Sequence, residues 1–335
     1  MRRTSSLLIC AALAWIATTA KGHHGAAPFD QQIRVTVEGV VTQFDYRNPH
    51  SFLYLRSTDS AGNAVDMTIE AQGSSLRPFG VTPDSLTAGE RVTAVIHPSR
   101  NSPREWGLGI EVIKQDGTVV PLQNRFARRP QRRNTGTATS IAGVWVPRDE
   151  DFFAFARNRP SLPLTEKGRE SLEQFNVNLS SHAECIAVPP PTLMLYGSVD
   201  VVEILDDRVL IHSDWMGAER VIYTDGRSAS DGQARTLYGY SVGHWEGDAL
   251  VVETTHFSNN NSGVAAGIAS GPQKRMTERF APTDAGAGLT YSFVVEDPEY
   301  LTQAISGSSR WDYRPDLLPD DVPCDLESAA RYLSE

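Results

Sequence analysis

Two adjacent histidines, His23 and His24, follow directly after an apolar leader and have the residue type and position of metal ligands. Cleavage of the leader after Ala20 would put His23 third in the mature chain. The free amine, two amide nitrogens and the imidazole would then form a square-planar set that suits Cu(II) or Ni(II). Cleavage after Gly22 would put His23 first, where its amine and imidazole can chelate one metal ion together. Both cleavage sites therefore predict a copper-competent terminus.

His50 is the third predicted metal ligand. It follows Pro49, which restricts the backbone and would present the imidazole from the end of a strand. Glu70, at the end of another predicted strand, is expected to supply an oxygen ligand or to orient one of the rings. The alternative is that His23 and His24 are solvated in a flexible terminus and that His50 is a turn residue.

A second candidate site lies in residues 239–257, whose pattern predicts a β-hairpin that turns at Gly247 and Asp248. This register makes His244 and Glu253 diagonal neighbours on one face of the hairpin. If that face lines a barrel cavity, the carboxylate would orient the imidazole as a general base. If the face meets solvent, the two side chains make an ordinary surface contact.

Three further residues are predicted contacts for a small-molecule ligand. Tyr240 shares the hairpin face of His244. Arg220 and Arg227 flank a turn at Asp225, and their guanidinium groups can bind a carboxylate or a phosphate. The alternative is that both arginines pair with local acids such as Asp225.

Several enzyme signatures are absent from the sequence. It contains no P-loop, His-Glu-x-x-His motif, dinucleotide-binding glycine fingerprint or zinc-binding cysteine pattern. Residues 239–243 match Gly-x-Ser-x-Gly, but the hydrolase elbow needs a strand followed by a helix, whereas a hairpin is expected here. We therefore do not expect Ser241 to be a nucleophile.

The first 22 residues have the pattern of a secretory signal peptide. Arg2 and Arg3 precede a short apolar segment that ends in small residues, and this segment is too short for a stable membrane span. No later stretch approaches the length of uncharged apolar sequence that a transmembrane helix needs. The mature protein is expected to be periplasmic or secreted, without a transmembrane segment.

Export gives the three cysteines a specific meaning. Cys10 leaves with the signal peptide, so that Cys185 and Cys324 remain. An even pair in an oxidising compartment predicts one disulfide, and the alternative is two buried free thiols.

Length, composition and charge limit the fold and the partners. A chain of 335 residues suggests two domains, and its 26 glycines and 20 prolines favour strands and turns. The net charge of -10 disfavours nucleic acid as a partner, because the phosphate backbone would be repelled by most of the surface. The expected partner is a small-molecule ligand.

The candidate residues would be positioned by two β domains. Short alternating strands from Ile33 onward predict a small OB-like β-barrel at residues 23–122. Residues 123–140 are rich in arginine and have the composition of a linker. Residues 141–335 predict a larger antiparallel, lipocalin-like barrel or curved sheet with one short helix, which Thr165 can cap.

The first half resembles a known family through three motifs. These are His-His-Gly at residues 23–25, Phe-Asp at 29–30 and Asn-Pro-His at 48–50. In these motifs the sequence resembles exported bacterial proteins of the DUF6152 type, over residues 23–122. The resemblance implies export and a β domain, and it implies no particular activity.

The second half is similar to another exported bacterial family, which has no settled activity. The resemblance rests on RVIYTDGR at residues 220–227, GYSVGHWEGDALVVET at 239–254 and ERF at 278–280, and it covers residues 141–330. That family usually has arginine at the position of His244. The resemblance implies architecture and export, so the chemistry must come from the residues themselves.

These features give three hypotheses of function, of which the third is an envelope assembly module, favoured if neither barrel has a cavity. The first is an exported small-molecule-binding protein with its ligand in the C-terminal barrel and a copper site at the N-terminus. The second is a periplasmic enzyme that acts on a hydrophobic or sugar-like small molecule by general acid/base chemistry, with His244 and Glu253. An enclosed position for these two side chains would favour the enzyme, and a solvent-facing position would favour the binding protein.

Overall fold

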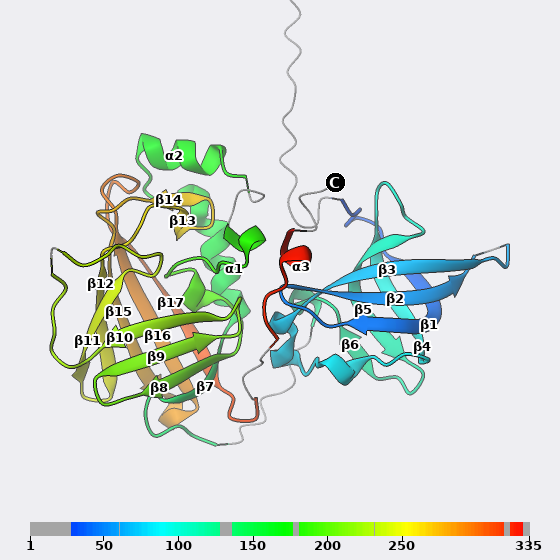
Figure 1. Ribbon diagram of the computed structural model, residues 1–335, viewed down its shortest axis with the longest axis horizontal. Helices are drawn as coiled ribbons and strands as arrows, with labels where there is room; N and C mark the ends of the chain where they lie inside the picture. Colours follow the sequence, from blue (N-terminus) through cyan, green and yellow to red (C-terminus); the bar gives the residue numbers. More distant parts are fainter. Residues whose placement is uncertain are drawn as a thin grey trace, which may run out of the picture.

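The computed structural model describes residues 28–59, 61–127, 136–176, 181–230, 232–317 and 322–330. Two β-barrels lie side by side, and the short helix α3 (Leu326–Ala330) lies between them (Figure 1). The prediction of an all-β fold with barrels is therefore confirmed. The predicted signal peptide at residues 1–22 and the centre of the predicted linker lie outside the described residues.

The small barrel has the strand order β1-β2-β3-β5-β4, closed by antiparallel pairing of β4 with β1 and parallel pairing of β3 with β5. The sixth strand, β6, pairs antiparallel with β5. This five-stranded closure fits the OB-like size that the sequence predicts. The strands are β1 (Val35–Asp45), β2 (His50–Thr58), β3 (Ala64–Gln72), β4 (Arg91–Pro98), β5 (Trp106–Lys114) and β6 (Val119–Pro121).

Alternating side chains fill the small barrel. Leu53, Ile69, Ala94 and Val112 come from four different strands and are completely buried. The 3-10 helix η1 (Ser74–Phe79) adds further apolar side chains to this core. Each large aliphatic side chain that is buried in this way contributes about 1.5–3 kcal/mol to the stability of the fold.

The larger barrel is closed by nine strands in the order β10-β11-β12-β15-β16-β17-β7-β8-β9. All neighbours are antiparallel except β10 and β11, which pair in parallel. The strands are β7 (Gly143–Pro147), β8 (Asp200–Ile204), β9 (Arg208–Ser213), β10 (Ala218–Tyr223), β11 (Tyr240–Glu246), β12 (Ala249–Thr255), β15 (Arg275–Thr283), β16 (Gly288–Glu296) and β17 (Ile305–Tyr313). The separate hairpin of β13 (Asn260–Ala265) and β14 (Ile268–Ser270) lies beside helix α2 (Glu166–Glu173).

Helix α2 is the one that the sequence predicts, and the hydroxyl of Thr165 caps it by accepting a hydrogen bond of 3.1 Å from the backbone N–H of Gly168. The prediction of a single helix is nevertheless wrong, because α1 (Asp149–Asn158) and α3 are also helical. The start of α1 carries no side-chain cap, so the usual sequence signal is missing. Three acidic residues in its first turn and the packing of Phe155 against Phe293 stabilise it instead.

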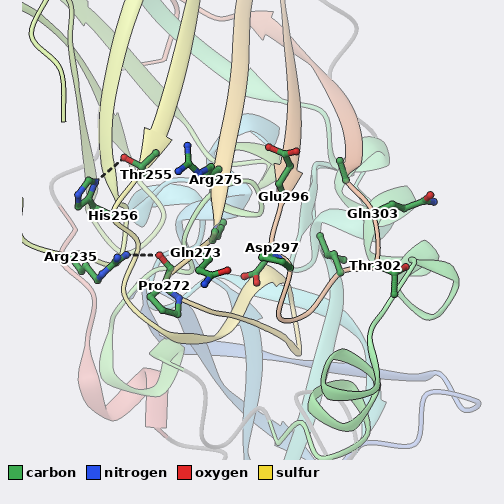
Figure 2. Close-up of a pocket in the computed structure, with 14 residues that line it drawn as sticks. Arg235, Thr255, His256, Pro272, Gln273, Arg275, Glu296, Asp297, Thr302 and Gln303 are labelled. Carbon is green, nitrogen blue, oxygen red and sulfur yellow. Dashed lines mark hydrogen bonds between the residues drawn. The ribbon is translucent and has the colours of Figure 1, made fainter. Parts of the chain in front are cut away.

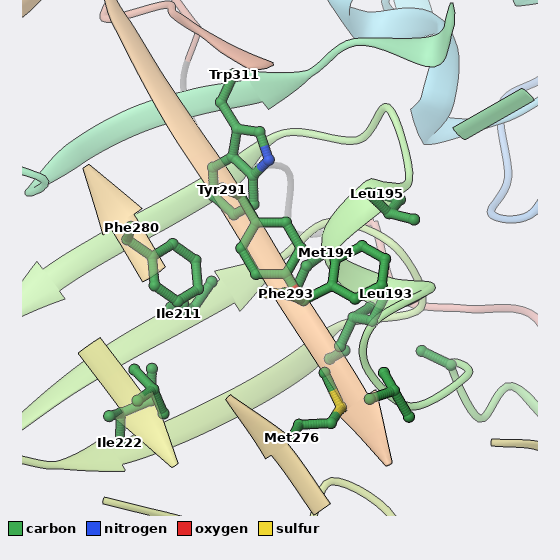
Figure 3. Packing of buried hydrophobic residues seen from close by; sticks show 14 of the residues in the cluster. Leu193, Met194, Leu195, Ile211, Ile222, Met276, Phe280, Tyr291, Phe293 and Trp311 are labelled. Carbon is green, nitrogen blue, oxygen red and sulfur yellow. The ribbon is translucent and has the colours of Figure 1, made fainter. Parts of the chain in front are cut away.

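Aromatic side chains fill the interior of the larger barrel (Figure 3). Trp145, Phe280, Tyr291 and Trp311 are at most 1% exposed. The rings of Phe280 and Tyr291 lie 5.0 Å apart between centroids, and that of Trp311 lies 6.0 Å from Tyr291. Packing of this kind leaves the barrel interior as a core, so a ligand must be sought at its ends or on its surface.

The two barrels are joined by polar contacts around Asp214. Its carboxylate accepts a hydrogen bond of 2.6 Å from Nη1 of Arg77, which belongs to η1 of the small barrel. Its backbone carbonyl accepts a second hydrogen bond, of 3.0 Å, from Nδ2 of Asn48. The Asn-Pro-His motif therefore lies at the junction between the barrels.

The C-terminal segment 322–330 also contacts this junction between the barrels. Cys324 forms a disulfide with Cys185, 139 residues earlier, which confirms the predicted pairing. The hydroxyl of Ser328 donates to the carbonyl of His50 at 2.7 Å and accepts from its N–H at 3.1 Å. The segment is thus bonded covalently to the larger domain and by hydrogen bonds to the small barrel.

Candidate functional site

A polar cleft of about 770 Å³ opens at one end of the larger barrel (Figure 2). Four segments form its walls: the loop before β11, which contains Arg235, the end of β12, the loop that enters β15, and the loop between β16 and β17. The residues that line it are Arg235, Thr255, His256, Pro272, Gln273, Lys274, Arg275, Glu296, Asp297, Pro298, Leu301, Thr302, Gln303 and Ala304. Convergent polar groups in a concave site are typical of ligand binding.

Asp297 ties two walls of the cleft together. Its Oδ2 accepts a hydrogen bond of 2.8 Å from the N–H of Gly271, and its Oδ1 accepts one of 3.1 Å from the N–H of Glu299. Burial raises the pKa of the Asp297 carboxyl above its usual range. A side chain at Gly271 would come within 2.7 Å of the Glu299 carboxylate, so the Glu299 side chain would have to move to admit it.

Arg235 and His256 form the opposite rim. Nη1 of Arg235 donates to the carbonyl of Pro272 at 2.5 Å and to that of Phe257 at 3.3 Å. His256 has a positive φ of 57°, which is uncommon for a residue other than glycine, and its Nδ1 lies 2.8 Å from Oγ1 of Thr255. These contacts fix one guanidinium group and one imidazole at the mouth of the cleft.

Arg275 and Glu296 face each other across β15 and β16 and are both exposed in the cleft. In the part of the chain that the structure describes, neither side chain has a hydrogen bond or an ion pair. One cation and one anion without polar partners among the described residues therefore lie at the opening of the cleft. Both groups can bind a ligand there.

Lys274 borders the cleft but its amine points into the protein. Nζ donates to the carbonyls of Pro190 at 2.6 Å and of Gly263 at 2.5 Å, and it lies 4.0 Å from the centroid of the Phe257 ring. Burial lowers the pKa of Lys274 to about 7. These bonds connect the β13–β14 hairpin to the loop at Pro190, so Lys274 stabilises the wall of the cleft.

The hairpin with His244 and Glu253 has the predicted register. His244 lies opposite Val251, and Gly247 adopts the positive φ of 61° that the turn requires. Both His244 and Glu253 face solvent, and the nearest carboxylate to the imidazole is that of Glu246, at 3.5 Å. The structure does not bring His244 and Glu253 into a pocket, so it offers no support for a general-base pair.

Arg220 lies in the core of the larger barrel and is 1% exposed. Its Nη1 donates to Oε1 of Glu278 at 2.7 Å, and its Nη2 donates to Oγ1 of Thr254 at 3.0 Å. Tyr291 adds a hydrogen bond of 2.9 Å to Glu278. The expectation that Arg220 contacts a ligand therefore has no support, because its guanidinium group is used in a buried network.

Arg227 and Tyr240 lie together on the surface of the larger barrel. Arg227 donates to Asp225 at 2.8 Å, which is the local pairing considered as the alternative to ligand binding. Its guanidinium group lies 4.0 Å from the centroid of the Tyr223 ring, and that ring lies 5.3 Å from Tyr240. None of these side chains is among the residues that line the cleft, although Tyr240 pairs across the strands with Thr255, which does line it.

The predicted copper ligands are only partly described. His23 and His24 lie outside the described residues. His50 begins β2, and its Nδ1 lies 3.3 Å from Oε1 of Glu70, as expected for a carboxylate that orients the ring. Within the described residues, no group of three histidine, cysteine, aspartate or glutamate side chains is arranged to hold a metal ion. The copper site remains a prediction.

Sequence reasoning missed the cleft. Its lining residues belong to segments whose proximity depends on closure of the barrel, and no motif marks them. The local signals of structure in these segments are two turn-forming pairs, Gly271-Pro272 and Asp297-Pro298. They predict loops without predicting a shared site.

Comparison with known proteins gives a family match in the N-terminal part of the chain. No helix in the described ranges has the length and apolar character needed to cross a membrane. No curated protein matches the chain. Residues 11–108, which contain β1 to β4 and the Asn-Pro-His motif, match the model of a family described as "Family of unknown function (DUF6152)".

Proposed function

We propose that this protein is exported and binds a polar, sugar-like small molecule in the cleft of the larger barrel. The observation that carries the proposal is the cleft itself, in which the amides of Gln273 and Gln303 accompany Arg275 and Glu296, two charged side chains without a polar partner among the described residues. The hydroxyl of Thr302 donates to the carbonyl of Pro163 at 3.1 Å and can still accept a hydrogen bond. Amides, hydroxyls, carboxylates and guanidinium groups supply the donors and acceptors that a hydroxylated ligand needs. A volume of about 770 Å³ lies within the range of small-molecule sites.

Export is supported by the Cys185–Cys324 disulfide, because such bonds persist in oxidising compartments. N-terminal sequencing of protein recovered from the periplasm or medium would test export and would identify the cleavage site. Metal analysis of the same sample would test the predicted site of His23, His24 and His50. A terminus without bound copper or nickel would remove the copper hypothesis and leave the cleft unaffected.

The binding function can be tested by saturation-transfer NMR on the mature protein. The ligands are D-glucose, D-galactose and their uronic acids, with indole as an apolar comparison. We expect signal transfer to sugars and none to indole. Ala304→Trp, which places a large ring at an exposed position in the cleft, should abolish the transfer.

The matched control is Ala64→Trp, at an exposed position at the start of β3 in the small barrel. It adds the same ring away from the cleft and should leave sugar binding unchanged. Equal transfer in wild type and Ala304→Trp would show that binding occurs elsewhere. The enzyme hypothesis with His244 and Glu253 has no comparable observation in its favour, because both side chains face solvent.

A further inference from the structure

The geometry points to a carboxylate on the ligand, bound by Arg275, so that the cleft selects sugar acids over neutral sugars. This inference rests on the proposed function and names the ligand class for the same cleft. The choice of ligand depends on which charged groups of the cleft already have polar partners and which do not.

Two of the five charged residues in the lining are fully used in holding the walls. Both carboxylate oxygens of Asp297 accept backbone N–H groups. The ammonium group of Lys274 donates to two backbone carbonyls inside the protein. Both side chains are also buried, each 1% exposed, so neither is expected to contribute to charge recognition.

Two guanidinium groups and one carboxylate remain. Arg275 and Glu296 have no polar partner within the described ranges, and the donors of Arg235 other than Nη1 are also without one. The uncommitted charge of the cleft is therefore positive, although the whole chain carries a net charge of -10. A local cationic site on an acidic protein favours one anionic group on the ligand and does not depend on attraction by the whole surface.

The positions of these groups define the ligand further. Arg275 is in register with Glu296 on neighbouring strands, and Figure 2 shows Thr255 beside Arg275. A guanidinium group binds a carboxylate through two parallel hydrogen bonds, and a carboxylate such as Glu296 accepts from sugar hydroxyls. A molecule with a carboxylate and several hydroxyls satisfies both residues at once, whereas a neutral sugar leaves Arg275 unsatisfied.

The test is isothermal titration of the mature protein with two matched pairs, D-glucuronate against D-glucose and D-galacturonate against D-galactose. The members of each pair differ only in the group at C6. We expect the uronate of at least one pair to bind about 10-fold more tightly than its neutral partner, as for a hydrogen bond to a charged group. Arg275→Gln should remove this preference, so that the uronate and the neutral sugar of each pair bind with similar affinity.

Arg91→Gln is the matched control, because Arg91 is exposed on β4 of the small barrel and its substitution removes the same charge. It should leave the uronate preference intact. Equal binding of both members of each pair, unaffected by Arg275→Gln, would overturn the carboxylate inference and leave the sugar-binding proposal standing. Absence of binding for all four sugars would overturn both. Circular dichroism of each variant would verify that the fold is retained.

Discussion

The carboxylate of Asp214 in the larger barrel accepts a hydrogen bond of 2.6 Å from Nη1 of Arg77 in the small barrel, with the Asp214 side chain completely buried. This buried ion pair is one of several contacts that fix the relative position of the barrels, together with those of Asn48 and Ser328. Removing the partner of a buried charge is costly, because the remaining charge cannot regain water.

Arg77→Leu is therefore expected to lower the free energy of unfolding by about 3 kcal/mol. Urea denaturation followed by tryptophan fluorescence would measure the change. The double variant Arg77→Leu with Asp214→Asn should lose less than the sum of the single variants, because the second change removes the stranded charge. Arg56→Leu, which breaks an exposed pair with Asp66, is the control and should leave the urea midpoint unchanged. Additive losses in the double variant would contradict a direct interaction.

The disulfide between Cys185 and Cys324 should be a large stabilising element. It closes a loop of 139 residues, for which the loss of chain entropy in the unfolded state predicts about 4–5 kcal/mol as an upper value. We expect reduction of the wild type to lower the urea midpoint, and the variant with both cysteines changed to serine to unfold at the same midpoint with or without reductant. A reductant effect that persists in the serine variant would show that the disulfide is not its cause.

The local features of the fold could be predicted from the sequence, because they depend on neighbouring residues. The hairpin of β11 and β12 has the predicted register, since side chains alternate and Gly247 supplies the positive φ of its turn. The cap of α2 by Thr165 follows from the same kind of local rule. The disulfide could be predicted because only two cysteines follow the predicted signal peptide.

The role of the Asn-Pro-His motif and the position of the cleft could not be predicted in this way. Asn48 contacts Asp214, which is 166 residues away, and this pairing exists only after the two barrels dock. The cleft joins Arg235, Arg275 and the loop after β16 through closure of the larger barrel. Arg220 on β10 donates to Glu278 on β15 across the interior of the barrel, although these two strands are not neighbours in the sheet. No local pattern could therefore indicate that its guanidinium group is buried and already paired. Long-range pairing therefore decides which polar residues face solvent.

The buried amine of Lys274 is expected to make the stability of the fold depend on pH above neutrality. Burial lowers its pKa to about 7 in the folded protein, whereas a lysine in an unfolded chain has a pKa near 10.4. Between these values the unfolded chain binds the proton and the folded protein does not, so stability should rise with pH by up to about 1.4 kcal/mol per pH unit. Lys274→Met should flatten this rise, as measured by urea denaturation from pH 7 to 10.

The control for this prediction is Lys167→Met, which removes a surface lysine paired with Glu299. It should not flatten the rise in stability above pH 7. If Lys167→Met and Lys274→Met change the pH dependence equally, the effect would come from net charge and not from the buried amine.

His182 is expected to make the stability of the fold depend on pH below neutrality. Burial, with a smaller contribution from His50, lowers the pKa of its imidazole to about 4, and the ring packs edge-on against Trp215 at 5.5 Å. Nε2 of His182 is buried without a hydrogen-bond partner among the described residues, so a proton there would be costly. An unfolded histidine takes up its proton near pH 6.5. Stability should therefore fall as the pH is lowered from 6.5 to 4, by up to about 3 kcal/mol.

The variant His182→Phe keeps the aromatic contact with Trp215 and removes the titrating ring. We expect its free energy of unfolding to decline less than that of the wild type between pH 6.5 and 4, as measured by urea denaturation at several pH values. His244→Phe removes a solvent-facing imidazole from β11 and controls for the general effect of losing one histidine. An unchanged decline in His182→Phe would show that the acid sensitivity arises from other groups. A change of similar size in both variants would exclude burial of His182 as its cause, because His182 has a buried Nε2 and an aromatic neighbour whereas His244 is exposed.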